Sequence, residues 1–186
     1  HQVVDRSGGF GVVGVGRGRF APYGGSGAAE VLELAFEPGK FLVSEAGYFL
    51  TKVITVKQTT STVFAQVDSG FNHLIRPMLY GSHHEIQNVS NPKGKERFYT
   101  VVGYICETDT FGSNRKIAEI SEGDVLAFKN AGAYCFTMAS NYNSRYRPAE
   151  VLWHEDKAHL IRKEEQFEDL LRNQILLDFK EKVAAN

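Results

Sequence analysis

The chain has 186 residues, of which 42% are hydrophobic and 12% aromatic, so it can bury one sizeable core. Its 21 Lys and Arg residues nearly balance its 22 Asp and Glu residues, and no block of like charge favours nucleic acid or an anionic membrane. The sequence has no apolar run that could span a bilayer, and Cys106 and Cys135 form no C-x-x-C motif. We therefore expect a cytoplasmic protein without a disulfide framework or a thiolate zinc site.

Three parts are expected along the chain: a glycine-rich linker at 1–33, a β domain at 34–177 and a polar tail at 178–186. Within the β domain, runs rich in Val, Ile, Phe, Tyr and Thr predict strands at 42–57, 61–68, 84–90, 96–105, 124–129, 132–138, 149–154 and 157–162. Turn residues separate these strands at 91–94, 122–124 and 154–156.

Helical spacing of apolar residues predicts two short helices, at 71–80 and 164–174. Many strands with few helices indicate a mainly β fold, either a sandwich or a partly closed barrel. Such a fold does not define a chemistry, so function has to be argued from particular residues.

Cys106 ends an apolar run and is followed by Glu107 and Asp109. The plainer interpretation is a strand-end thiol beside solvated carboxylates, because a free cysteine is usually a small buried hydrophobe. Nearby carboxylates disfavour a thiolate, so a functional Cys106 is better suited to donating a proton than to nucleophilic attack.

Arg76 and Tyr80 lie four residues apart, and Pro77 limits the helix between them. At this spacing both side chains can point to one side. A guanidinium there could bind a carboxylate through two hydrogen bonds, whereas the plainer alternative is a surface arginine packed on a tyrosine.

Tyr134 follows a small-residue turn at Gly132, and strand alternation predicts it on one face with Phe136 and Met138. Core packing is the plainer role for these side chains, and Cys135 on the opposite face is expected to be structural. Because it lies near the flexible Gly132, Tyr134 is also a candidate contact for a phosphate or a substrate.

Other motifs are weak when taken alone. Residues 37–40 read as a turn, and the glycine-rich residues 7–11 lack the pattern of a phosphate-binding P-loop. His83 and His84 are adjacent strand residues that face opposite ways, so no metal site is predicted.

Taken in order, these segments resemble the diaminopimelate decarboxylases, pyridoxal-phosphate enzymes of the alanine-racemase-like group. The resemblance extends from about residue 34 to residue 174. It is carried by FEPGK at 36–40, LIRPMLYG at 74–81, VGYICE at 102–107, GAYCFTMASNYN at 132–143 and RPAE at 147–150. Ornithine and arginine decarboxylases share the fold and parts of this pattern.

The resemblance implies a β/α barrel that holds the cofactor and a C-terminal β domain that completes the active site across a head-to-tail homodimer. This chain would be that β domain with remnants of the barrel. Cys106, delivered from the partner subunit, would protonate the carbanion that remains after carbon dioxide leaves. Glu107 would hold the distal amino group of meso-diaminopimelate, and Arg76 and Tyr80 would bind its distal carboxylate.

By the same resemblance, Tyr134 would contact cofactor and substrate. Glu37, Pro38, Gly39 and Lys40 would lie along the cofactor phosphate, with Gly9 in a glycine-rich loop at the same phosphate. Lys40 stands where the family usually has a substrate-binding arginine, so a bidentate contact would become a point charge.

Residues 11–37 do not resemble the family's helical connection, and no lysine here has the sequence context of the Schiff-base lysine. We therefore expect the isolated chain to be an inactive fragment. Two alternatives remain: a fragment of another basic-amino-acid decarboxylase, or a non-catalytic β domain that associates with decarboxylase subunits. A distal-carboxylate site and a glutamate after Cys106, where ornithine decarboxylases have an aspartate, favour the diaminopimelate assignment.

Overall fold

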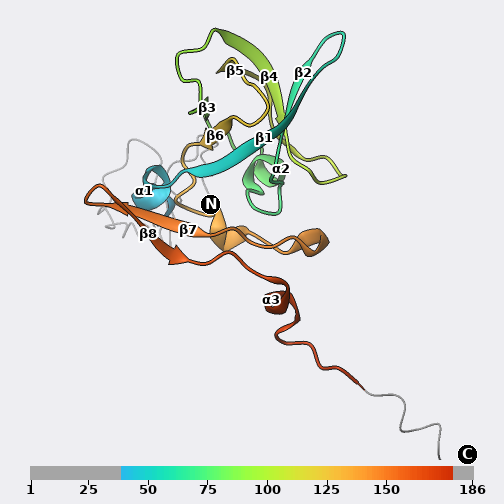
Figure 1. Cartoon of the computed structure of the whole chain (residues 1–186), viewed down its shortest axis with the longest axis vertical. Coiled ribbons are helices and arrows are strands. Elements are labelled where there is room, and N and C mark those ends of the chain that lie inside the picture. The colour runs from blue at the N-terminus through green and yellow to red at the C-terminus, as the bar shows by residue number, and fades with distance from the viewer. Residues whose placement is uncertain (1–38, 178–186) are drawn as a thin grey trace, which may run out of the picture. The chain divides into compact units, whose positions relative to one another are not determined.

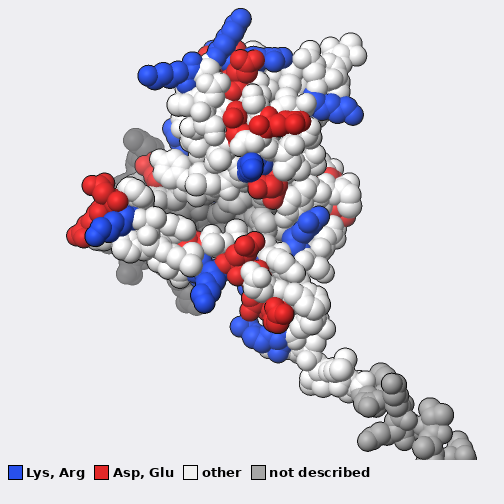
Figure 2. Space-filling view, viewed as in Figure 1, with Lys and Arg blue, Asp and Glu red and all other residues white. Residues whose placement is uncertain are grey.

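The computed structural model describes residues 39–177, in two compact units that divide between Met138 and Ala139 (Figure 1). Three predicted site residues, Gly9, Glu37 and Pro38, lie outside the described residues, as do the glycine-rich segment and the polar tail. No helix within 39–177 is long and apolar enough to cross a membrane. On the face in Figure 2, basic and acidic side chains are interspersed, as the balanced composition predicts.

The first unit is built mainly from strands. Its helices are α1 (Gly39–Val43) and α2 (Arg76–Tyr80), with 3-10 turns at Ser44–Ala46 and Phe136–Met138. Its strands are β1 (Phe49–Gln58), β2 (Val63–Val67), β3 (Ile86–Asn88), β4 (Glu96–Val102), β5 (Thr110–Ala118) and β6 (Val125–Phe128).

These strands form one sheet in the order β3-β6-β1-β2-β4-β5, antiparallel except for the β2–β4 pair. The two ends of this order, β3 and β5, contact each other, so the sheet curls into a nearly closed barrel. The predicted mainly β fold with a partly closed barrel is confirmed.

The core lies inside the curled sheet and is set by strand alternation. In β1, Phe49, Thr51 and Val53 are buried, and the residues between them are exposed. The ring of Phe128 packs 5.7 Å from that of Phe49 and 5.0 Å from that of Phe111, centroid to centroid. Each such buried ring stabilises the fold by roughly 1.5–3 kcal/mol.

Two predicted strands are wrong in part or in whole. The strand expected from residue 42 begins only at Phe49, because α1 and the 3-10 turn occupy 39–46. The strand expected at 132–138 does not form. There the Gly132 N–H donates to the Ser44 carbonyl at 3.0 Å, and Tyr134 adopts a left-handed φ of 60°. Tyr134 therefore shares no strand face with Phe136 and Met138.

Other differences concern the lengths of elements. Strand β5 was not predicted, because its middle residues Asn114, Arg115 and Lys116 interrupt the apolar pattern. The helix expected over 71–80 begins at Arg76. The strand expected over 96–105 ends at Val102, which leaves residues 103–109 as a loop.

The second unit contains the hairpin of β7 (Glu150–His154) and β8 (Lys157–Arg162), followed by α3 (Phe167–Leu171). Both predicted strands are confirmed. Glu155 and Asp156, with φ of 49° and 57°, form a two-residue turn within the turn predicted at 154–156, and its left-handed geometry matches the twist of a hairpin. The predicted helix at 164–174 is shorter, and a reciprocal capping box between Gln166 and Asp169 fixes its start.

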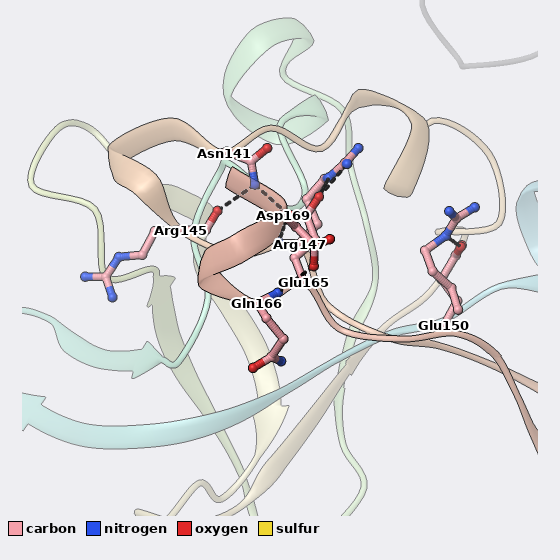
Figure 3. Close-up of polar contacts among 8 residues, drawn as sticks. Asn141, Arg145, Arg147, Glu150, Glu165, Gln166 and Asp169 are labelled. Atoms are coloured by element: carbon pink, nitrogen blue, oxygen red, sulfur yellow. Dashed lines mark hydrogen bonds and ion pairs between the residues drawn. The ribbon is translucent and has the colours of Figure 1, made fainter. Parts of the chain in front are cut away.

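One carboxylate organises the segments around this hairpin (Figure 3). Glu165 accepts hydrogen bonds from the Arg147 Nε at 2.7 Å, the Arg147 backbone N–H at 2.8 Å and the Asn141 amide at 2.5 Å. These bonds hold the pKa of Glu165 at about 2, and the largest cause is the Arg147 side chain. Residues 141–147 and 165 are thereby tied together at the open end of the hairpin.

Candidate active site

Arg76 is the centre of a cluster of predicted site residues. It opens the short helix α2, which Gly81 ends in a left-handed conformation with φ of 64°. The Arg76 Cζ lies 5.1 Å from the ring centroid of Tyr80 and 5.4 Å from that of Tyr134. The expectation that Arg76 and Tyr80 lie on one side is confirmed, and the guanidinium packs on two tyrosines rather than one.

The Nε of Arg76 is buried and has no hydrogen-bond partner among the described residues. A buried donor without a partner costs roughly 1–3 kcal/mol, so folded proteins rarely keep one without a purpose. A guanidinium between two aromatic rings with an unsatisfied N–H is suited to bind a carboxylate or a phosphate.

Positive charge accumulates around this guanidinium. Burial lowers the pKa of Lys40, and the charge of Arg76 lowers it further. Burial also lowers the pKa of His84; its hydrogen bond to the Lys129 carbonyl partly opposes this, and the charges of Arg76 and Lys40 lower the pKa further. The groups lie close enough to repel one another in the absence of an anion, and a bound anion would relieve this repulsion.

The start of α1 lies beside Tyr134. A Cβ at Gly39 would lie 3.8 Å from the Tyr134 hydroxyl, which is an ordinary contact. Tyr134 reaches this position because the chain turns at Gly132, where a Cβ would lie 1.9 Å from the Val43 carbonyl oxygen. Of the predicted site residues, Gly39, Lys40, Arg76, Tyr80 and Tyr134 thus form one group, which we call the arginine cluster.

Cys106 and Glu107 lie on the loop that follows β4. Cys106 is exposed, and its thiol donates to the Glu107 carboxylate with Sγ and Oε2 3.5 Å apart. Within the described part of the chain, Cys106 makes no hydrogen bond to the arginine cluster. The thiol therefore faces outward, beside an acceptor on the next residue.

Two residues near the site were missed from the sequence. The sequence presents His84 only as a poor metal ligand, yet its Nε2 is buried without a partner in the described structure while its Nδ1 donates to the Lys129 carbonyl at 2.9 Å. In the sequence Asp109 is only an acid near Cys106, but in the structure it is buried and bonded to two separate segments. Burial of a polar side chain depends on tertiary packing, so no local pattern signals it.

Comparison with known families decides what this site belongs to. The family model described as "Pyridoxal-dependent decarboxylase, C-terminal sheet domain" matches residues 15–132. The chain belongs to this family. The matched part contains four of the five residues of the arginine cluster, and Tyr134 lies just beyond it. It also contains Cys106 and Glu107.

Curated relatives and solved structures agree with the family. The sheet domain is 49% identical over 143 residues to the diaminopimelate decarboxylase of Methanothermobacter thermautotrophicus, covering 76% of this chain and 33% of the relative. It matches the structure of diaminopimelate decarboxylase from M. jannaschii in complex with L-lysine, with a TM-score of 0.71, 40% identity and coverage of 76% of this chain and 32% of that chain. The chain therefore spans about one third of the relatives it matches.

A more distant structure shares the fold alone. The lysine/ornithine decarboxylase of Vibrio vulnificus, complexed with cadaverine, is 16% identical with a TM-score of 0.52, over 58% of this chain and 30% of that chain. The sheet domain is thus common to decarboxylases of different substrates, and the substrate has to be argued from side chains.

Proposed function

We propose that this sheet domain supplies the carboxylate-binding and proton-donating part of a pyridoxal-phosphate-dependent diaminopimelate decarboxylase, a cytoplasmic enzyme that converts meso-2,6-diaminopimelate to L-lysine. The observation that carries the proposal is the buried, unpartnered Nε of Arg76 between the rings of Tyr80 and Tyr134. The names of the relatives, at 49% and 40% identity, support the same substrate.

Arg76 is proposed to bind the distal carboxylate, which is the carboxylate that the product retains. A carboxylate accepts two N–H groups of a guanidinium side by side, and the Tyr80 ring holds the guanidinium plane. Lys40 adds a second positive charge but only a single point of contact, since an ammonium has no planar fork.

The residues present also suit the anionic end of pyridoxal phosphate. Gly39 at the start of α1 adjoins the Tyr134 hydroxyl, and Lys40 is the next residue, so the three offer a cation, a hydroxyl donor and close backbone approach. Glu37, Pro38 and Gly9 are proposed to belong to the same site. When bound, pyridoxal phosphate accepts the electron pair of the bond that loses carbon dioxide.

Cys106 is proposed to donate a proton to the substrate carbon that has lost carbon dioxide. Its thiol already donates to the Glu107 carboxylate. The same carboxylate is proposed to accept a hydrogen bond from the distal ammonium group of the substrate. Because Cys106 is exposed and makes no hydrogen bond to the arginine cluster within 39–177, we propose that it serves the site of a second subunit in a homodimer.

A pair of ligands that differ in one carboxylate tests the proposal on the chain itself. L-lysine carries the carboxylate that Arg76 would bind, and cadaverine lacks it. Titrations followed by NMR should show tighter binding of L-lysine, and Arg76→Gln should remove most of that difference, worth about tenfold or more for a bidentate pair. Equal affinity for the two ligands in the unchanged chain would refute the carboxylate site and favour a decarboxylase of simpler basic amino acids.

A further inference from the structure

Asp109 is a buried carboxylate that the proposed chemistry does not use. The residue is only 5% exposed. Oδ1 accepts the Phe71 backbone N–H at 2.8 Å, and Oδ2 accepts the Ile105 backbone N–H at 2.9 Å. Its own backbone carbonyl accepts the Gly103 N–H at 2.8 Å. Each oxygen of the carboxylate therefore bonds to a different segment of the chain.

The two segments are those that carry the proposed site residues. Phe71 belongs to the turn that leads into Arg76 and Tyr80 on α2, and Ile105 directly precedes Cys106 and Glu107. The Tyr104 N–H donates to the Ser69 carbonyl at 2.9 Å, so the segments also touch through their backbones. A carboxylate between them fixes the distance from one to the other.

The space for this carboxylate depends on two glycines. A Cβ at Gly103 would lie 2.1 Å from Asp109 Oδ2, and a Cβ at Gly70 would lie 2.7 Å from the same atom. Both distances are too short for any side chain, so glycine at each position lets the backbone approach the carboxylate. The pocket admits the carboxylate because both neighbouring segments omit a side chain.

We infer that Asp109 is a positioning residue, which holds the Cys106–Glu107 loop in register with the turn that presents Arg76. This inference rests on the proposed function. An aspartate is required because both of its oxygens accept N–H groups, whereas an asparagine of the same shape offers one acceptor and one donor. In Asp109→Asn, one of the two backbone N–H groups therefore faces another donor and its segment is released.

Hydrogen exchange and thiol labelling on the purified chain test the positioning directly. Asp109→Asn should speed exchange in 70–75 and 103–108 by about tenfold or more, while β1 and β6 stay protected. The labelling rate of the Cys106 peptide, followed by mass spectrometry, should change in the same variant. Unchanged exchange in either segment, or an unchanged labelling rate, would overturn the inference.

Asp124→Asn is the matched control. Asp124 Oδ2 also accepts a backbone N–H, from Ser121 at 2.8 Å, and the Asn88 amide at 2.8 Å, but in the turn before β6. If Asp109 merely contributes to stability, both variants should loosen the unit alike. Release of 70–75 and 103–108 in Asp109→Asn alone supports the positioning role, and the same release in Asp124→Asn overturns it.

A measurement on the unchanged chain covers the case in which Asp109→Asn fails to fold. Burial raises the pKa of Asp109, and the backbone N–H groups of Ile105 and Phe71 partly oppose this. In an NMR pH titration, the amide protons of Phe71 and Ile105 should therefore shift together with one common midpoint. Different midpoints, or no shift in Phe71, would show that no shared carboxylate joins the segments.

The functional consequence is separable from the proposed function itself. In the decarboxylase that contains this segment, Asp109→Asn should lower kcat by about tenfold to a hundredfold and change KM much less, because misplacing a proton donor slows the chemical step. An unchanged kcat would overturn the inference. Absence of turnover in the unchanged enzyme would instead refute the proposed function, and the exchange and titration results would still decide whether Asp109 ties the two segments.

Discussion

The guanidinium of Arg76 lies 5.4 Å from the ring centroid of Tyr134, although the two residues come from segments far apart in the chain. Sequence spacing relates Arg76 to Tyr80, but only the curled sheet brings Tyr134 to the other contact. The site is therefore a product of the fold of the first unit, and its properties can be tested through each residue that builds it.

Arg76→Lys keeps the positive charge and removes the planar fork. We expect L-lysine affinity to fall by about tenfold, because an ammonium cannot bind a carboxylate bidentately or stack on two rings. Isothermal titration or NMR gives the affinity. Arg97→Lys is the matched control, since the Arg97 Cζ lies 5.8 Å from the Tyr99 ring outside the cluster. A similar loss in both variants would contradict a specific role for Arg76.

Gly132→Ala should destabilise the first unit more than almost any other glycine substitution. The new Cβ would lie 1.9 Å from the Val43 carbonyl oxygen, which is backbone and cannot rotate away. We expect a loss of about 2 kcal/mol or more in the free energy of unfolding, measured by urea denaturation. Gly39→Ala is the control, since among the described residues its Cβ would meet only the Tyr134 hydroxyl, at 3.8 Å. Equal stability of the two variants would mean that the turn at Gly132 is not close-packed.

The turn at Gly132 also shows where sequence reasoning stops. Alternation predicted a strand at 132–138, and the apolar pattern there is genuine. The left-handed φ of Tyr134 and the hydrogen bond from Gly132 to Ser44 override it, and both depend on the neighbouring 44–47 turn. The β7–β8 hairpin was predicted well, because alternation and turn residues are local and agree with each other.

The same distinction applies to the site. The proximity of Arg76 and Tyr80 is predictable because four-residue spacing is a local signal, and Cys106 and Glu107 are candidates in the sequence because they are adjacent. Asp109 and His84 are not, because their burial arises from segments 30 or more residues away, such as Phe71 for Asp109 and Lys129 for His84. A buried polar side chain is recognisable only once its neighbours are placed.

Glu165→Gln should loosen the second unit. The variant loses the ion pair with Arg147, and the N–H groups of Arg147 then face a neutral amide. This should lower the stability of the unit by roughly 1–3 kcal/mol. Glu150→Gln is the control: the Glu150–Arg162 pair is more exposed, with Oε2 2.5 Å from Nε, and should contribute about 0–1 kcal/mol. Hydrogen exchange of residues 141–147 measures the difference. Equal exchange in both variants would contradict the ranking.

The pH dependence of the second unit follows from the same carboxylate. The folded pKa of Glu165, about 2, lies below its ordinary value of 4.5, so its contribution to stability is fully present above pH 4.5. Protonation removes this contribution as the pH falls from 4.5 towards about 2. In Glu165→Gln this acid-dependent loss should be smaller than in the unchanged chain. An identical acid transition in both proteins would show that Glu165 is not linked to folding.

The two cysteines should differ in reactivity as the structure places them. Cys106 is exposed, whereas Cys135 is partly buried with its Sγ 3.5 Å from the His73 carbonyl oxygen. A thiol reagent should therefore label Cys106 in a fast phase that Cys106→Ala removes, while Cys135→Ala leaves that phase in place. In the decarboxylase that contains this segment, Cys106→Ala should lower turnover by about a hundredfold with little change in cofactor binding, because a general acid acts only in the chemical step. Equal loss of turnover and of cofactor binding would argue against Cys106 as the proton donor and for a structural role of its loop.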